Sequence, residues 1–331
     1  MTDSDPLGPL RLRDLIYNAI EQKNLQALER AFSHWNLAVS SLHVSDPDGH
    51  LEEFLFCAAE LQLRDIANYL KDKGAKLRDW EVVDAFLEDE SFEEEKWNLF
   101  LELGWDVNDN SARLRSLLSS LAVKGDHGDN VTRFQWLLAH GADPNQPFPP
   151  SSSVMNSIRA RQVTQGTSLR RMPLDFASCG WSTQMVDMLL QYGASLTRAN
   201  PLHAISCWPR DNIAEFQHMG EHLLELGVDI NAFEFAGDPE YKERVVRAAD
   251  YRYLGTPLHY AAHTGSAEQV QFLLQHGADR HKVNESHGFT ALDLAFCRRS
   301  SMFPDGNTGQ QAVLDLLTDG NKSLQVNSQL Y

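Results

Sequence analysis

The sequence predicts an all-α protein in which pairs of helices repeat along the chain and stack side by side. Three observations point to this fold: glycines that recur in a common context, apolar pairs at a fixed distance before them, and a helix-start motif ahead of the later copies. The chain has 331 residues, of which 42% are hydrophobic and 23% are charged. That composition is ample for a buried core, either in about two domains or in one long array.

The recurring glycines mark the ends of predicted helices. Five of them begin segments of similar sequence, and Gly320-Asn is a weaker sixth example. The five segments are Gly104-Trp-Asp-Val-Asn, Gly141-Ala-Asp-Pro-Asn, Gly193-Ala-Ser-Leu-Thr, Gly227-Val-Asp-Ile-Asn and Gly277-Ala-Asp-Arg-His. Because glycine adopts the left-handed conformation that ends many helices, we interpret each of these glycines as a C-cap.

An apolar pair lies four and three residues before each glycine. The pairs are Phe100/Leu101, Leu137/Leu138, Leu189/Leu190, Leu223/Leu224, Leu273/Leu274 and Leu316/Leu317. The residues seven before are Trp97, Phe134, Val186, Gly220, Val270 and Val313. A spacing of i, i+3 and i+4 places such side chains on one face of a helix, and only Gly220 interrupts this face.

A preceding helix is predicted for each of the last four copies. Its start is Met172-Pro-Leu-Asp175, Asn200-Pro-Leu-His203, Thr256-Pro-Leu-His259 or Thr290-Ala-Leu-Asp293. A capping Thr or Asn followed by Pro at the first helical position is a helix-start signal. The run Thr256-Pro-Leu-His-Tyr-Ala-Ala-His-Thr-Gly265, continued by Val270 to Asp279, resembles the ankyrin repeat.

The resemblance implies an ankyrin-repeat α-solenoid, all-α apart from short β-hairpin fingers, with about seven repeats and an N-terminal helical cap. We expect a single array over residues 10–320, between a disordered segment 1–9 and a tail 321–331. The cap is expected at 10–44 and the repeats at about 51–79, 80–109, 112–145, 172–198, 200–231, 256–283 and 290–320. The glycines lie 34 to 52 residues apart, above the period of roughly 33, which predicts insertions at 146–171, 232–255 and 300–309.

The charge balance excludes some classes of partner. Acidic residues outnumber basic ones 46 to 29, for a net charge of −17, which disfavours nucleic acid and anionic membranes. The sequence contains no apolar run long enough for a membrane helix and no secretory signal pattern, so we expect an intracellular monomer, cytoplasmic or nuclear. Residues 81–109 hold eleven acids against Lys96 alone. They form either a solvated helix face or a surface that captures a basic segment of a partner.

The resemblance implies a protein-binding function without enzyme activity or cofactor, as an adaptor, a scaffold or an inhibitor. In the family, three positions after the helix-start motif tend to face a concave groove. The candidates carried over are Phe176, Cys179, Cys207, Trp208, Tyr260, His263, Thr264 and Arg298. Aromatic residues and arginine at such positions are typical of binding hot spots. Phe176, and Leu294 at the same position of the last repeat, could instead pack against the adjacent repeat.

Two of the helix-start motifs carry the structural signature of the repeat most completely. Their residues are Asn200, Pro201, Leu202 and His203 in one repeat, and Thr256, Pro257, Leu258 and His259 in the next. The resemblance implies that all eight are structural, and that the imidazoles of His203 and His259 hydrogen-bond within and between repeats.

A second histidine pattern allows another interpretation. His218-Met-Gly-Glu-His222 fits the HxxEH pattern of inverted zinc proteases, so a zinc hydrolase that uses Glu221 is one alternative function. A structural spacer is another.

Two loop sites, at Thr164 and Ser301, follow arginines as basophilic kinase substrates do. A phosphate at either site would add roughly −1.5 to −2 charge beside those arginines.

Overall fold

The structure is a computed structural model, and it describes residues 9–42, 48–89, 91–108, 116–146, 172–207, 213–237, 239, 255–297 and 308–318. The chain divides into two compact units, Met1–Arg113 and Leu114–Tyr331. The described residues form sixteen helices and no strand. The prediction of an all-α repeat fold is therefore confirmed.

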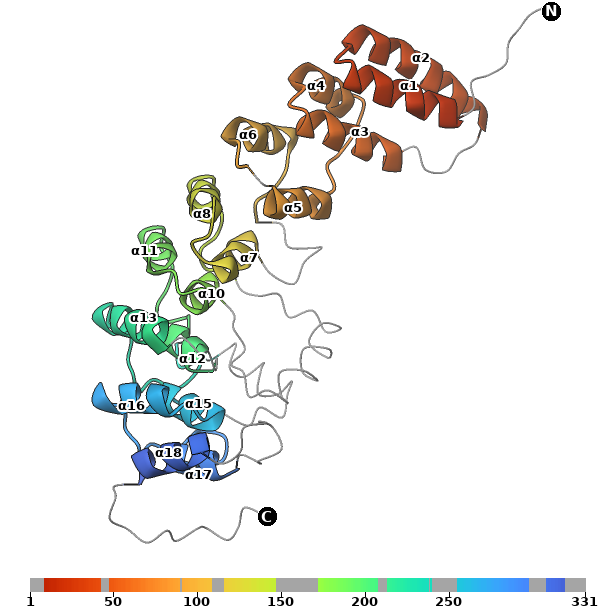
Figure 1. The fold of residues 1–331 in the computed structure, drawn as a ribbon. Helices are drawn as coiled ribbons and strands as arrows, with labels where there is room; N and C mark the ends of the chain where they lie inside the picture. The colour runs from red at the N-terminus through yellow and green to blue at the C-terminus, as the bar shows by residue number, and fades with distance from the viewer. Residues whose placement is uncertain are drawn as a thin grey trace, which may run out of the picture. The chain divides into compact units, whose positions relative to one another are not determined.

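The first unit consists of three consecutive helix pairs (Figure 1). They are α1 (Pro9–Glu21) with α2 (Leu25–Leu42), α3 (Asp48–Glu60) with α4 (Arg64–Asp72), and α5 (Asp79–Glu88) with α6 (Glu94–Leu103). α3 packs against α1 on one side and α6 on the other. The core of the third pair is aromatic, with Phe86 and Trp97 edge to face at 4.7 Å between ring centroids.

The second unit continues the same pattern in two rows of helices, visible in Figure 1. The first helices of the pairs are α7 (Leu117–Lys124), α10 (Pro173–Cys179), α12 (Pro201–Ser206), α15 (Pro257–Thr264) and α17 (Ala291–Cys297). The second helices are α8 (Asn130–Ala139), α11 (Thr183–Gln191), α13 (Ile213–Glu225), α16 (Ala267–Gln275) and α18 (Thr308–Leu317). Each first helix packs against the first helix of the next pair, so the pairs stack in chain order.

The recurring glycines have the predicted conformation wherever the structure describes them. Gly104, Gly141, Gly193, Gly227 and Gly277 have φ between +88° and +108°, in the left-handed region. After α16, for example, Gly277 and Ala278 donate their N–H groups to Leu274 and Leu273 at 3.2 and 2.9 Å. These bonds satisfy carbonyls that the end of the helix would otherwise leave unpaired. Gly320 lies outside the described residues.

The predicted apolar face forms the core of each second helix. Trp97, Phe134, Val186, Val270 and Val313 are fully buried, as expected for residues seven before the caps. The one interruption, Gly220, has a packing reason in the next repeat. A Cβ atom at Gly220 would lie 2.8 Å from the ring of Phe272, which packs edge to face on Phe216 at 5.3 Å.

The fingers that follow the C-cap glycines are turns, without the short β-hairpins expected from the resemblance, as far as the structure describes them. Their contacts run through side chains. Asn145 donates to the Gly193 carbonyl at 2.8 Å and accepts from the N–H of Ser195 at 2.9 Å. Asn231 bonds the following finger in the same way, at Gly277 and Asp279. One asparagine amide thus replaces the backbone ladder that would define a strand.

The predicted insertions fall largely outside the described residues. This applies to 147–171, to 240–254 and to 300–307, and also to residues 1–8 and the tail 321–331. Residues 232–237, expected within an insertion, belong to a finger. The N–H of Glu234 bonds the carbonyl of Gly255 at 3.0 Å, as that of Asn284 bonds Phe289 at 2.7 Å. The same closing bond spans 21 residues of sequence in the first case and five in the second.

A close backbone contact between neighbouring first helices of the second unit predicts a strongly destabilising substitution. A Cβ atom at Gly180 would lie 2.0 Å from the carbonyl oxygen of Ala122 in the preceding repeat. Gly180 has φ of −78°, so the conformation itself accepts alanine and the cost is steric. We expect Gly180→Ala to lower the free energy of unfolding by about 2–3 kcal/mol, measured by urea unfolding followed by circular dichroism.

The matched control is Gly309→Ala in α18, where the added Cβ would meet its nearest atom at an ordinary 3.5 Å. It should leave stability unchanged or raise it by about 0.5–1 kcal/mol. Equal midpoints for the two variants would contradict the contact.

Candidate functional site

The helix-start motif forms a closed hydrogen-bonded unit in the structure. At α15, the N–H of Thr256 donates to Nδ1 of His259 at 3.1 Å, within the same turn. At α17 an aspartate plays this part, because Asp293 accepts from the N–H of Thr290 at 2.8 Å. Histidine and aspartate are interchangeable here because both offer an acceptor to the N-terminal N–H of the helix.

The proline and leucine of the motif also lie where packing uses them. Pro201 and Pro257 are the first residues of α12 and α15, a position at which the missing N–H of proline costs no hydrogen bond. Leu202 and Leu258 follow them, and both are 0% exposed. These leucines belong to the core between repeats and offer no surface to a partner.

The two histidines of the motif join neighbouring repeats. Nε2 of His259 donates to the carbonyl of Phe289 at 3.0 Å, and Nε2 of His203 donates to that of Ala232 at 3.0 Å. Since Nδ1 of His259 accepts a hydrogen bond, this ring is neutral with its proton on Nε2. Burial lowers the pKa of His203 to about 4 and also lowers the pKa of His259.

A series of buried hydrogen bonds through side chains links three successive fingers in the same region. Asp175 accepts from the N–H of Met172 in its own repeat at 3.0 Å, and from that of Asn200 in the next at 2.6 Å. The side-chain oxygen of Asn200 in turn accepts from the N–H of Phe235 at 2.8 Å. These bonds hold the N-terminal ends of the first helices in register.

Four of the predicted groove residues lie in the packing between repeats. Phe176, Cys179, Cys207 and Tyr260 are 1–3% exposed. The Tyr260 hydroxyl donates to the fully buried carboxylate of Glu234, and its ring packs edge to face on His203 at 5.9 Å. Such burial leaves these side chains almost no surface to offer a partner in the conformation described.

The remaining groove candidates divide into two groups. His263 is partly exposed, whereas Thr264 is nearly buried and its hydroxyl donates to the carbonyl of Ala261 at 3.0 Å. Trp208 and Arg298 lie outside the described residues, as do the loop sites Thr164 and Ser301. Among the candidates that the structure describes, His263 is therefore the one that a partner can contact directly.

The HxxEH pattern lies on α13, and its residues do not converge. His218 and Glu221 are exposed, and Nε2 of His222 lies 2.9 Å from Oδ1 of Asp187 on α11. In the part of the chain that the structure describes, no group of three histidine, cysteine or acidic side chains is placed to hold a metal ion. His222 thus joins two second helices of the stack.

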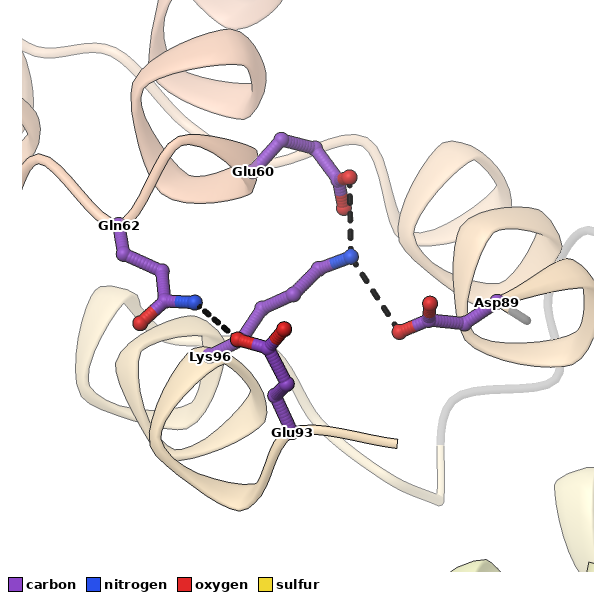
Figure 2. Close-up of polar contacts among 5 residues, drawn as sticks. All are labelled: Glu60, Gln62, Asp89, Glu93 and Lys96. Carbon is purple, nitrogen blue, oxygen red and sulfur yellow. Dashed lines mark hydrogen bonds and ion pairs between the residues drawn. The ribbon is translucent and has the colours of Figure 1, made fainter. Parts of the chain in front are cut away.

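The acidic stretch of the first unit contains an ion-pair cluster that joins its last two helix pairs (Figure 2). Nζ of Lys96 on α6 lies 3.0 Å from the carboxylate of Glu60 on α3 and 3.3 Å from that of Asp89 after α5. Beside it, the amide of Gln62 donates to Glu93 at 2.6 Å. Lys96 is 12% exposed, so its two ion pairs are better shielded than ordinary surface pairs.

Further acids lie between α1, α3 and α5. Glu53 is paired with Arg13 at 2.9 Å, and Glu52 is paired with Arg78. Burial raises the pKa of Glu81, Arg78 lowers it, and Glu53 and Glu52 raise it again. On balance the pKa of Glu81 is raised above its ordinary value, and burial is the main cause.

In a comparison with protein families, one family model matches a segment of the second unit. The ankyrin repeat model matches residues 255–285, the segment that contains the capping unit of Thr256, the α15–α16 pair and the finger after Gly277. These residues form an ankyrin repeat. No curated protein matches the chain.

Several features of the structure were not apparent from the sequence. The buried Tyr260–Glu234 pair joins residues 26 positions apart, and no spacing rule relates them. The bridging role of Asn145 and Asn231 could have been suspected, because both occupy the same place after a C-cap glycine.

No helix among the described residues combines the length and the apolar character needed to cross a membrane.

The buried His203 predicts a specific acid sensitivity. Its pKa falls from 6.5 to about 4 on folding, so its contribution to stability is complete above pH 6.5. The contribution is lost as the pH falls toward 4, because the unfolded chain binds a proton that the folded chain excludes. This single group accounts for roughly 3 kcal/mol of the loss over that range.

We expect His203→Gln to flatten the pH dependence of the urea midpoint between pH 6.5 and 4, since glutamine does not titrate. His281→Gln, at an exposed finger position, should keep the wild-type slope. Identical slopes for the two variants would show that His203 does not carry the effect.

Proposed function

We propose that this ankyrin-repeat protein is a non-enzymatic adaptor, scaffold or inhibitor that binds another protein through the groove side of its first helices and its finger tips. The coarser statement comes from the family: the ankyrin repeat is a protein–protein interaction module. Neither the class of regulatory role nor the partner follows from the family alone.

The observation that carries the proposal is the way neighbouring first helices are locked together. The Gly180 and Ala122 backbones are in direct contact, and the side chains of Asp175 and His203 form hydrogen bonds with adjacent repeats. The surface along this row is therefore fixed before any partner arrives. A preorganised surface loses little conformational entropy on binding, which favours recognition of a folded or extended partner.

His263 offers the sharpest test of the groove in the second unit. It lies in the last turn of α15 and is partly exposed. We expect His263→Glu to weaken binding of a partner, first captured with wild-type protein and then purified, by about tenfold or more. Isothermal titration with the purified partner measures the affinity.

The control is Gln271→Glu, an exposed position on the second helix α16, which introduces the same charge away from the groove. It should bind as the wild type does, and circular dichroism should show both variants folded. Equal affinity of the two variants would remove the groove from the proposal.

A further inference from the structure

One side of α5 lies away from its apolar packing. The apolar side chains Val82, Val83, Phe86 and Leu87 fill its buried side. At about 100° per residue, four other side chains follow one another within roughly 100° of arc on the opposite side. In angular order these are Trp80, Asp84, Glu88 and Glu81.

Trp80 is the most exposed large apolar residue that the structure describes. Its side chain is 48% exposed, and no described ring or cation stacks on it. A buried tryptophan such as Trp97 stabilises the core, but Trp80 contributes little there. The face of an exposed indole attracts cations, and the planar guanidinium of arginine stacks on it better than an ammonium does.

Two carboxylates on the same face are available to such a cation. Glu88 is exposed at the end of α5. One oxygen of Glu81 is enclosed yet accepts no hydrogen bond from the described residues. The nearby arginine, Arg78, donates its Nε–H group to Glu52 instead. The Glu81 side chain as a whole is only half-buried, so the rest of its carboxylate can receive a donor from outside.

Four other acids of residues 81–109 that the structure describes have partners or roles within the fold. Asp89 is paired with Lys96, and Glu102 with Arg64. Glu94 and Glu95 occupy the first turn of α6, where negative charge interacts favourably with the positive end of the helix dipole. The α5 face is thus distinguished from the general acidity of the stretch by its tryptophan and by its unsatisfied carboxylate.

We propose that this α5 face, formed by Trp80, Glu81 and Glu88, binds an arginine-rich segment of a partner protein. One guanidinium stacks on the indole, and its neighbours pair with the carboxylates as bidentate donors. The proposal rests on the protein-binding function above and adds the chemistry of the partner. It also adds a second contact surface, in the first unit.

Binding of labelled nona-arginine and nona-lysine peptides to the full chain tests the role of the tryptophan. We expect the arginine peptide to bind about threefold more tightly than the lysine peptide at about 150 mM salt. Trp80→Ala should abolish that preference, whereas Tyr192→Ala, which removes another exposed aromatic ring, should preserve it. A preference that survives in Trp80→Ala would overturn the proposal.

Two double variants that remove the same number of negative charges test the carboxylates. Glu81→Gln with Glu88→Gln should weaken binding of the arginine peptide about tenfold, whereas Glu94→Gln with Glu95→Gln should weaken it less than twofold. Equal losses would show that only overall acidity matters and would overturn the site. Since the His263 experiment probes the second unit with a natural partner, either proposal can fail while the other stands.

Discussion

The second unit depends on the satisfaction of backbone polar groups at the places where its short helices begin. A helix of six to ten residues leaves a large share of its N–H and carbonyl groups without partners inside the helix, and burying them in a stack would be costly. His259 and Asp293 close the turn of their own helices, while Asp175, Asn200 and His203 reach the next repeat. The same kind of side chain therefore starts each helix and fixes its neighbour.

Close backbone approach is the second consequence of this arrangement. Because neighbouring first helices meet at Gly180 and Ala122, and Gly220 makes room for Phe272, there is little space between repeats for a larger side chain. Hydrogen bonds between the repeats require this short distance. Gly180 and Gly220 allow it because they have no Cβ atom that would collide with the neighbouring repeat. The resulting surface has its shape set by packing, which leaves the exposed side chains to determine what it binds.

The helix pairs of the first unit share an apolar core, and their polar contacts include ion pairs in place of buried caps. Ion pairs join α1 to α3 and α3 to α6 through Arg13 and Lys96, and Arg64 adds one between α4 and α6. No Thr-Pro-Leu-His motif starts its helices. Ion pairs restrict the composition of a helix face less than buried caps do, because the charged groups remain near water. This freedom is consistent with the sequence degeneracy of these pairs, and it leaves α5 able to carry Trp80 on its outer face.

The sequence by itself determined the helix pairs, their C-cap glycines and the buried face of each second helix, because these depend on interactions within about seven residues. Periodicity and capping chemistry act locally, so the roles of Gly277 and Val270 follow from their immediate neighbours in the chain. Only the tertiary structure decided which positions are exposed: Tyr260, expected in a groove, is buried against Glu234, and Trp80 is exposed on α5. Exposure depends on how distant segments pack, and a finger such as the one that contains Glu234 can cover a position that the repeat pattern alone leaves open.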